Sequence, residues 1–594
     1  MSPPDRREAA AAAALVLLGV GLRLLLVTLY PTEPLSDFRG LVLFGLRLRD
    51  EGMTVPGWHW VQFSPGLPLL LSGLFRVFPR GVFATAREAT AIVTGLAPLA
   101  PFLIWRGVLA LRWRFLAGLL LAVWPGQVAF SGVVAQENWA LLPAVALACL
   151  AVRRLRDPAS GGFPLAAGLL YAVTGVVRQE LLLALLPPVL AAAGLPGARA
   201  SRGRRVRRLA AAAGAPLIAL AGWRAAATGR FAVTTAHGGL GVLGTLAPGS
   251  ARAGWVDPML FAASTEPRFL TDSAALRREA WRLAGEEARR RWRFHAFRAA
   301  VSGLRLSAET ETRDLLWSSL EEPGAQPPAR AASAASLARR VGPWLRAELC
   351  LISGFFAASL LLGLRRRDPA LLVLGAAVLL ETLAVILFSA LGRLMVPAIG
   401  LELLALPLAA STLDPVRRRG EAALFPAIGI ASAALLFWAT PPLERLAIRR
   451  DEAPPRLREF PMLIAGGGGV FGHCEVEKGY CSTFSGDRAR IEPGAGSGTP
   501  GRSLVRCRLP RLPADAALFL DFDAPGEAVV RIEADGRRLA APEKSGPVWR
   551  RVVLAAAGED RPREIALEAE GAVGFGVVSR APGTPPLPRD RTFP

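Results

Sequence analysis

The chain has 594 residues, of which 52% are hydrophobic, and its mean hydropathy is +0.36. Soluble proteins of several domains are rarely so apolar, so the composition argues against a soluble enzyme. The formal net charge of +22 is carried almost entirely by arginine, but no basic stripe is interleaved with base-stacking aromatic residues, and we expect no nucleic-acid partner.

The first apolar run covers residues 9–30 and follows a short head that contains Arg6 and Arg7. Such a head is also typical of a signal peptide, but no clear small-residue cleavage site follows, which favours a retained first helix. Ten further apolar runs follow, at 84–105, 115–132, 138–152, 164–178, 181–196, 209–224, 346–364, 370–390, 394–411 and 421–440. Because roughly 17–25 apolar residues span a bilayer as a helix, we expect a polytopic α-helical membrane domain of about 11 transmembrane helices over residues 1–450.

Arginine-rich segments separate many of these runs. Arginine in short loops marks the cytoplasmic side of a membrane protein. With a cytoplasmic N-terminus and about eleven spans, all of these segments fall on the cytoplasmic side: 106–114, 153–158, 199–208, 365–369 and 414–421. The same topology predicts a multi-pass protein of the inner (plasma) membrane, with the loops 31–83 and 225–345 and the C-terminal tail outside the cytoplasm.

Polar residues collect at the expected outer ends of separate helices: Asp37 and Arg39, Gln136 and Glu137, Arg178 and Glu180, and Arg393. Moving a sugar from a lipid phosphate to a hydroxyl group needs a carboxylate that accepts the acceptor's proton. It also needs cations to hold the departing phosphate, and the planar guanidinium group matches phosphate oxygens well. The set therefore forms a candidate transferase site, although any single acid or arginine at a helix end is more often simply solvated.

Five segments follow one another along the first 440 residues: "PLSDFRGLVLFGLRLRDEG", "FSPGLPLLLSGLFRVFP", "AQENWALLP", "VVRQELLLALLPP" and "GRLMVPAIG". In this order they resemble the GT-C superfamily of membrane glycosyltransferases, of the kind that includes protein O-mannosyltransferases and lipid A aminoarabinose transferases. The resemblance implies a polyprenyl-phosphate-sugar donor and a sugar transfer that inverts the anomeric centre. It makes Asp37 and Glu137 the catalytic carboxylates, and Arg178 and Arg393 the groups that bind the donor phosphate.

The resemblance also implies substrate-binding positions: Gln136, Glu180, His237, His59 and Gln62. His237 stands in "TTAHGGLGVLG", where the family usually has asparagine. His59 lies in "PGWHWVQF", and a lone histidine in such a setting is more often an interfacial residue beside the two tryptophans.

The chain departs from the family pattern at two places in the first outer loop. Phe38 follows Asp37, where the family often has a second acid. Ser64 replaces the first proline of a Pro-Pro pair, and Gln62 and Phe63 stand where a basic residue is common. These departures leave open a catalytically inactive relative that acts as a binding module.

The tail has a different pattern, with short alternating strands separated by turns. It predicts an extracytoplasmic β-sandwich-like domain over residues 455–594, in which Asp535–Gly536 forms a hairpin turn. In an oxidising compartment Cys474 and Cys481 are a candidate disulfide, with Cys507 as a competing partner. Such a domain could bind an acceptor carbohydrate or peptide, or could simply cover the site.

We expect no cofactor, because no ligand spacing requires a metal ion, although a few carboxylates could hold a divalent one. The expected partners are the polyprenyl-phosphate sugar donor, membrane lipids and an extracytoplasmic glycan, lipid or protein acceptor. A transporter or flippase for lipid-linked sugars is the main alternative. Glu381 and Glu402 lie in the middle of expected spans, where ionisable residues are functional candidates by default.

Overall fold

The computed structural model describes most of the helical part of the chain and the strands of its tail. The described residues are 6–32, 36–52, 64–160, 162–194, 199–228, 231, 233, 238–247, 250, 273–308, 328–388, 392–413, 419–451, 459–463, 471–478, 480–484, 489–492, 502–509, 517–523, 531–539, 549–556, 559–560, 562–570 and 573–580. The chain divides into two compact units, Met1–His237 with Phe297–Leu446, and Gly238–Ala296 with Ala447–Pro594.

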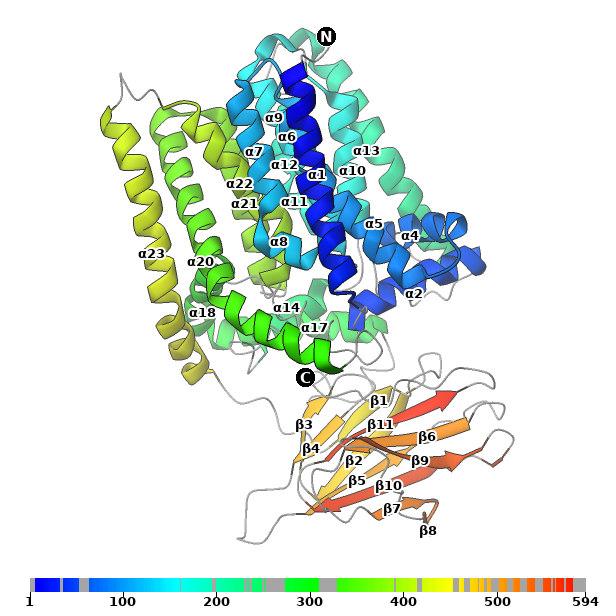
Figure 1. The fold of residues 1–594 in the computed structure, drawn as a ribbon. Coiled ribbons are helices and arrows are strands. Elements are labelled where there is room, and N and C mark those ends of the chain that lie inside the picture. The colour runs from blue at the N-terminus through cyan, green and yellow to red at the C-terminus, as the bar shows by residue number, and fades with distance from the viewer. Residues whose placement is uncertain are drawn as a thin grey trace. The chain divides into compact units, whose positions relative to one another are not determined.

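The described secondary structure of the first unit is helical, and that of the second contains helices and strands (Figure 1). In chain order they are α1 (Arg6–Leu29), α2 (Ser36–Asp50), α4 (Gly66–Val77), α5 (Val82–Leu96), α6 (Leu99–Ile104), α7 (Leu111–Val123), α8 (Pro125–Phe130), α9 (Gln136–Arg156), η2 (Pro158–Ser160), α10 (Pro164–Val177), α11 (Leu181–Ala184), α12 (Leu186–Ala192), α13 (Arg199–Thr228), α14 (Gly238–Leu246), α17 (Ser273–Arg290), α18 (Trp292–Leu306), α20 (Pro328–Arg366), α21 (Pro369–Phe388), η4 (Gly392–Met395), α22 (Val396–Ala410) and α23 (Arg419–Arg450).

Seven of the described helices are long and apolar enough to cross a membrane: Arg6–Leu29, Val82–Ile104, Gln136–Arg156, Arg202–Ala226, Arg340–Arg366, Pro369–Phe388 and Gly420–Arg450. They indicate a membrane-embedded helical protein, as the composition predicts. The predicted count of about eleven spans stays a prediction. Three further apolar helices, including α10 and α22, are shorter than a full span, and the run 115–132 is divided between α7 and α8.

The core of the bundle is built around α9. Its buried residues include two consecutive turns of small and branched side chains, from Ala144 to Val152. It contacts α5, α6, α10, α12, α21 and α22, and all of these helices carry apolar residues toward it. A helix that is apolar on most of its surface is expected at the centre of a bundle, and α9 takes that place.

Close helix contacts at glycine hold α1 against α5. A Cβ atom on Gly19 would lie 2.3 Å from the carbonyl oxygen of Gly95, and a Cβ atom on Gly95 would lie 2.7 Å from the Cα of Val20. Small residues allow helices in a membrane to approach until their backbones touch. The position of α1, which carries a buried arginine discussed below, is therefore fixed by backbone contact.

The segment 273–306 forms two helices, α17 and α18, separated at Arg291. One face of α17 packs on α14 through Ala280, Leu283 and Leu243. The opposite face carries an ion-pair series on Arg282.

The C-terminal β region, Glu459–Arg580, contains two antiparallel sheets. Its strands are β1 (Glu459–Leu463), β2 (Phe471–Lys478), β3 (Tyr480–Phe484), β4 (Ala489–Glu492), β5 (Arg502–Arg508), β6 (Ala517–Asp523), β7 (Arg531–Ala534), β8 (Arg537–Arg538), β9 (Trp549–Ala555), β10 (Glu564–Glu570) and β11 (Val573–Arg580). The six-stranded sheet has the order β1-β2-β5-β10-β7-β8 and the five-stranded sheet the order β3-β4-β11-β6-β9. One apolar core takes side chains from both sheets.

The predicted turn at Asp535–Gly536 joins β7 to β8. Both residues have positive φ, 47° and 75°, which is the combination that a tight hairpin turn requires. The Asp535 carboxylate also accepts hydrogen bonds from the backbone N–H groups of Arg563 and Glu564, at 3.0 and 2.9 Å.

The disulfide prediction was wrong in its partner. Cys474 is bonded to Cys507, not to Cys481. Cys474 and Cys507 lie opposite each other on the neighbouring strands β2 and β5, with their Cα atoms 4.0 Å apart. Cys481 belongs to β3, which is part of the other sheet. The strand register therefore makes Cys507 the partner of Cys474. The spacing of cysteines along the chain does not reveal that register.

Candidate functional site

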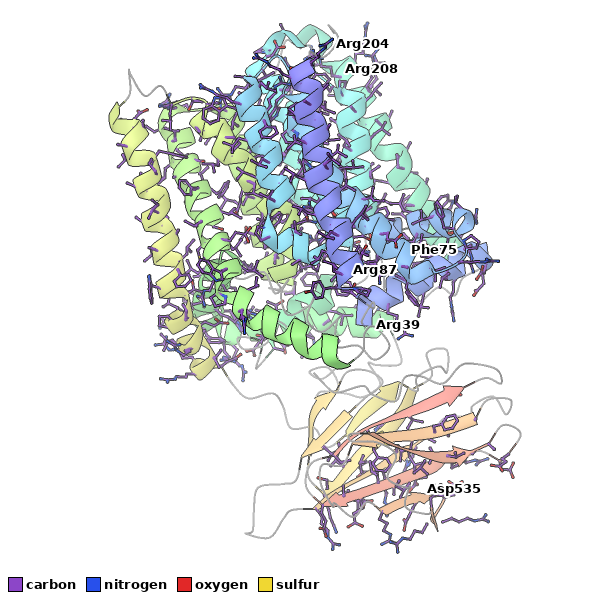
Figure 2. All side chains as sticks on the ribbon, in the orientation of Figure 1. Arg39, Phe75, Arg87, Arg204, Arg208 and Asp535 are labelled. Atoms are coloured by element: carbon purple, nitrogen blue, oxygen red, sulfur yellow. A yellow bond between two sulfur atoms is a disulfide. The ribbon has the colours of Figure 1, made fainter. Side chains whose placement is uncertain are left out.

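One end of the helical bundle gathers polar side chains from helices that are distant in the sequence. We call it the Arg178 end; it comprises the C-terminal ends of α1, α10 and α21 and the N-terminal ends of α9 and α22. Figure 2 shows Arg39 and Arg87 near this end, whereas Arg204 and Arg208 lie at the end where α1 begins. The two ends differ in kind, because the arginines of the second are largely exposed.

Arg178 is the central residue of the site. It follows the last turn of α10, where its backbone leaves the helix (φ −146°, ψ 99°) and its N–H still donates to the Thr174 carbonyl at 2.7 Å. Only 2% of its surface is exposed. Its Nη1 donates to the carbonyl oxygen of Leu394, in η4, at 2.6 Å. The change of backbone direction after α10 thus places the Arg178 side chain inside the protein. There its guanidinium group is held by the Leu394 carbonyl, which lies far away in the sequence.

Two carboxylates approach this guanidinium group. Glu381, in the last two turns of α21, has Oε1 3.6 Å from Arg178 Nη1, and Glu180 has Oε2 3.8 Å from Arg178 Nε. Both distances exceed those of a good hydrogen bond. Among the described residues no group forms a hydrogen bond with Arg178 Nη2 or with either oxygen of Glu381. Both carboxyl groups therefore lie close to the guanidinium group, but neither forms a hydrogen bond with it.

The start of α9 is attached to the same end. Gln136 donates from Nε2 to the Ser64 carbonyl at 2.9 Å, and Ser64 Oγ donates to the Val176 carbonyl at 3.0 Å. A Cβ atom on Gly66 would lie 2.4 Å from that same carbonyl, so the start of α4 is in backbone contact with the end of α10. Glu137 follows in the first turn of α9 and is buried, where the helix dipole favours its negative charge.

Glu402 brings a further acid into the bundle. It is buried on α22, and its Oε2 accepts a hydrogen bond from Ser353 Oγ, on α20, at 3.1 Å. Together with Glu137 and Glu180 it acts electrostatically on Glu381. Two carboxylates, Glu180 and Glu381, thus lie close to Arg178, and two more, Glu137 and Glu402, act on Glu381.

A second buried cation, Arg23, supports this end from α1. Its Nη1 donates to the carbonyl oxygens of Gly19 and Ala122, both at 2.8 Å, and its Nη2 donates to the Leu121 carbonyl at 3.1 Å. Leu121 lies four residues before Pro125, which has no N–H to complete the helical hydrogen bond. Arg23 therefore satisfies carbonyl groups that the break between α7 and α8 leaves without helical partners.

The same network continues to the start of α9. Arg23 Nε donates to Gln127 Oε1 at 2.8 Å, Gln127 Nε2 donates to Asn138 Oδ1 at 3.3 Å, and Asn138 Nδ2 donates to the carbonyls of Phe130 and Val133 at 2.9 and 2.8 Å. Because Asn138 directly follows Glu137, this chain of bonds fixes the turn that carries the acid.

The other side of the break receives an acid. The N–H of Gly126, in the first turn of α8, donates to the carboxylate of Glu348 on α20. A carboxylate thus meets the N-terminus of α8, and the guanidinium of Arg23 meets the carbonyls at the C-terminus of α7, as the helix dipoles favour.

The structure places the sequence-predicted residues as follows. It brings Arg178 and Glu180 together and joins Gln136 to the end of α10 through Ser64. Asp37 lies in the first turn of α2, which packs on α4. Its side chain lies outside the described part of the chain, as do the side chain of Arg393 and the whole of His59, Gln62 and His237.

Three residues of the site were not found from the sequence: Arg23, Gln127 and Asn138. A signal existed for Arg23, which interrupts the apolar run 9–30. Glu381 was identified as an acid inside a span, but its pairing with Arg178 needs the three-dimensional structure.

Comparisons with known proteins add no assignment. No protein-family model matches the chain, and no curated protein sequence matches it.

Proposed function

We propose that the protein is an integral membrane glycosyltransferase that moves a sugar from a polyprenyl-phosphate donor to the hydroxyl group of an extracytoplasmic acceptor. The observation that carries the proposal is Arg178, a buried arginine at the end of a membrane bundle whose Nη2 has no hydrogen-bond partner among the described residues. A guanidinium group with free donors at such a depth fits a phosphate whose isoprenoid chain stays in the lipid.

The order of segments along the chain supports the same proposal, because it resembles the GT-C superfamily from the first outer loop to Arg393. The clustering of exposed arginines at the opposite end of the bundle supports a cytoplasmic placement of that end. The Arg178 end and the C-terminal β region are then extracytoplasmic. An oxidising compartment also suits the Cys474–Cys507 disulfide.

The proposed reaction is a single displacement. Asp37 accepts the proton of the acceptor hydroxyl, whose oxygen forms a bond to the anomeric carbon. The bond between that carbon and the phosphate oxygen breaks, and its electron pair stays on the phosphate. Arg178, with Arg393, stabilises the negative charge that develops there. Glu137, held at the start of α9, orients the acceptor. Attack opposite the leaving group inverts the anomeric centre.

The buried acids Glu381 and Glu402 favour a second candidate function, a transporter of lipid-linked sugars, because carboxylates inside a membrane bundle commonly line substrate or proton paths. This candidate predicts movement of the lipid-linked sugar across vesicle membranes without release of the sugar. It also predicts that Asp37→Asn leaves that movement intact.

The test is sugar release from a radiolabelled polyprenyl-phosphate sugar by the purified protein in detergent. Three variants accompany the wild type: Asp37→Asn, Arg178→Gln and Asp50→Asn. Asp50 is the matched control, since it is an acid at the other end of α2 that pairs with the adjacent Arg49.

We expect release by the wild type and by Asp50→Asn, and a loss of about 100-fold or more in Asp37→Asn, as for removal of a general base. Full activity of Asp37→Asn would remove Asp37 from the mechanism. Transport without release by the wild type would support the second candidate.

A further inference from the structure

We infer that phosphate binding at Arg178 is coupled to protonation of Glu381, so that the carboxylate acts as an internal counter-ion which a bound phosphate replaces. The inference rests on the proposed function, because it takes Arg178 as the phosphate-binding group. It adds a role for an acid that the transfer reaction itself does not use.

Arg178 and Glu381 lie within ion-pair distance of each other but are not hydrogen-bonded. The 3.6 Å separation of Glu381 Oε1 from Arg178 Nη1 allows charge attraction without a hydrogen bond. Both side chains are almost fully buried, with 2 to 3% of their surface exposed. A buried cation that awaits an anionic ligand is costly when it stands alone. Glu381 lowers that cost while leaving the Nη2 donor free.

The arrival of a phosphate changes the balance of charge. Around Glu381 the groups that act electrostatically are one cation, Arg178, and three acids, Glu137, Glu180 and Glu402. A phosphate on Arg178 adds negative charge next to a buried carboxylate that already faces this excess of acids. Like charges at short range favour the neutral form of one partner. A proton taken up from water onto Glu381 restores the balance.

Glu381 is the acid best suited to accept this proton. Glu402 receives a hydrogen bond from Ser353, Glu137 lies at a helix N-terminus, and both features stabilise a carboxylate. The side chain of Glu180 is 40% exposed and is therefore solvated. Glu381 has no hydrogen-bond donor among the described residues. The charged residue of the adjoining η4 is Arg393, whose side chain lies outside the described part of the chain.

The experiment measures proton uptake when the purified protein binds farnesyl phosphate in detergent. Titration calorimetry in two buffers of different ionisation enthalpy gives the number of protons taken up per ligand bound. The wild type is compared with Glu381→Gln, with Arg178→Gln and with Asp50→Asn, a control acid that pairs with the adjacent Arg49 and does not act on Glu381.

We expect Glu381→Gln to bind with fewer protons taken up than the wild type, by a difference that approaches one, and Asp50→Asn to behave like the wild type. As pH rises, the wild type should lose affinity relative to Glu381→Gln, by up to about tenfold per pH unit, the limit for one coupled proton. Equal proton uptake and equal pH profiles in the wild type and Glu381→Gln would overturn the inference and leave the phosphate site intact.

Binding that does not depend on Arg178, with Arg178→Gln equal to the wild type, would remove both the phosphate site and the inference. A second readout uses only the wild type and so does not depend on the folding of a variant. The infrared carbonyl band of a protonated, buried carboxyl group should appear when farnesyl phosphate is added. Absence of that band at saturating ligand would contradict the inference directly.

Discussion

Charged side chains are treated in opposite ways in the helical bundle and in the C-terminal β region. In the bundle, Arg23 and Arg178 are buried and meet mainly backbone carbonyls, with few or loose acid partners. In the β region the charges lie at the surface of the six-stranded sheet and face one another across strands, as Arg506 does with Glu564 and Glu477. A charged side chain that is buried without a full counter-charge lowers the stability of the fold. An exposed ion pair changes the stability little in either direction.

The difference shows where to look for function. A buried charge persists only where it satisfies other buried groups or awaits a ligand. Arg23 is of the first kind, since its bonds to the Leu121 and Ala122 carbonyls complete the α7–α8 break. Under the proposed function Arg178 is of the second kind, and its Nη2 has no hydrogen-bond partner among the described residues. The exposed pairs of the β region are solvated on both partners and need no such explanation.

The largest expected effect follows from replacing Arg23 by leucine. The substitution removes the donors to the Leu121 and Ala122 carbonyls and to Gln127. Each buried polar group left without a partner costs about 1–3 kcal/mol. We therefore expect a marked fall in the thermal unfolding midpoint in detergent. Leu25→Ala is the control, because Leu25 lies on the exposed face of the same helix. An unchanged midpoint in Arg23→Leu would show that Arg23 is not part of the scaffold.

A smaller effect is expected from the disulfide in the β region. Replacing Cys474 or Cys507 by serine should lower the stability of this region by about 2–4 kcal/mol, mainly because the unfolded chain loses a cross-link. Cys481→Ser should leave stability unchanged, since Cys481 does not take part in the bond. The check is chemical denaturation with a near-ultraviolet probe, together with mass spectrometry of non-reduced peptides. A Cys474–Cys481 peptide pair would contradict the structure.

The helical nature of the chain, the position of each apolar run and the change to strands near residue 455 were all predictable, because they depend on local composition and periodicity. The Asp535–Gly536 turn was predictable for the same reason. Pairings between distant residues were not. Cys474 is bonded to Cys507 because the strand register places the two residues opposite each other. Arg178 lies near Glu381 because α10 and α21 end at the same end of the bundle.

The broken helices show the same limit. The apolar run 115–132 reads as one span in composition, but Pro125 divides it, and the break is stable only because Arg23 and Glu348 satisfy its two ends. Nothing within the run itself indicates those partners, which lie about 100 residues before it and more than 200 after it along the chain.

The smallest effect should come from the surface pairs of the β region. The hydrogen bonds from Arg506 to Glu564 and Glu477 raise the pKa of its guanidinium group. A raised pKa in a cation stabilises the folded state below the pKa of the unfolded chain, and the gain is lost only as pH rises through the folded-state pKa, far above the neutral range. Stability should therefore show no Arg506-dependent change between pH 6 and 9, and Arg506→Ala should cost under about 1 kcal/mol. Most of even that loss should vanish in 1 M salt, where the Debye length falls to about 3 Å. A loss of several kcal/mol that salt does not reduce would contradict this prediction. It would show that Arg506 is held as strongly as a buried charge, so that the two regions do not differ.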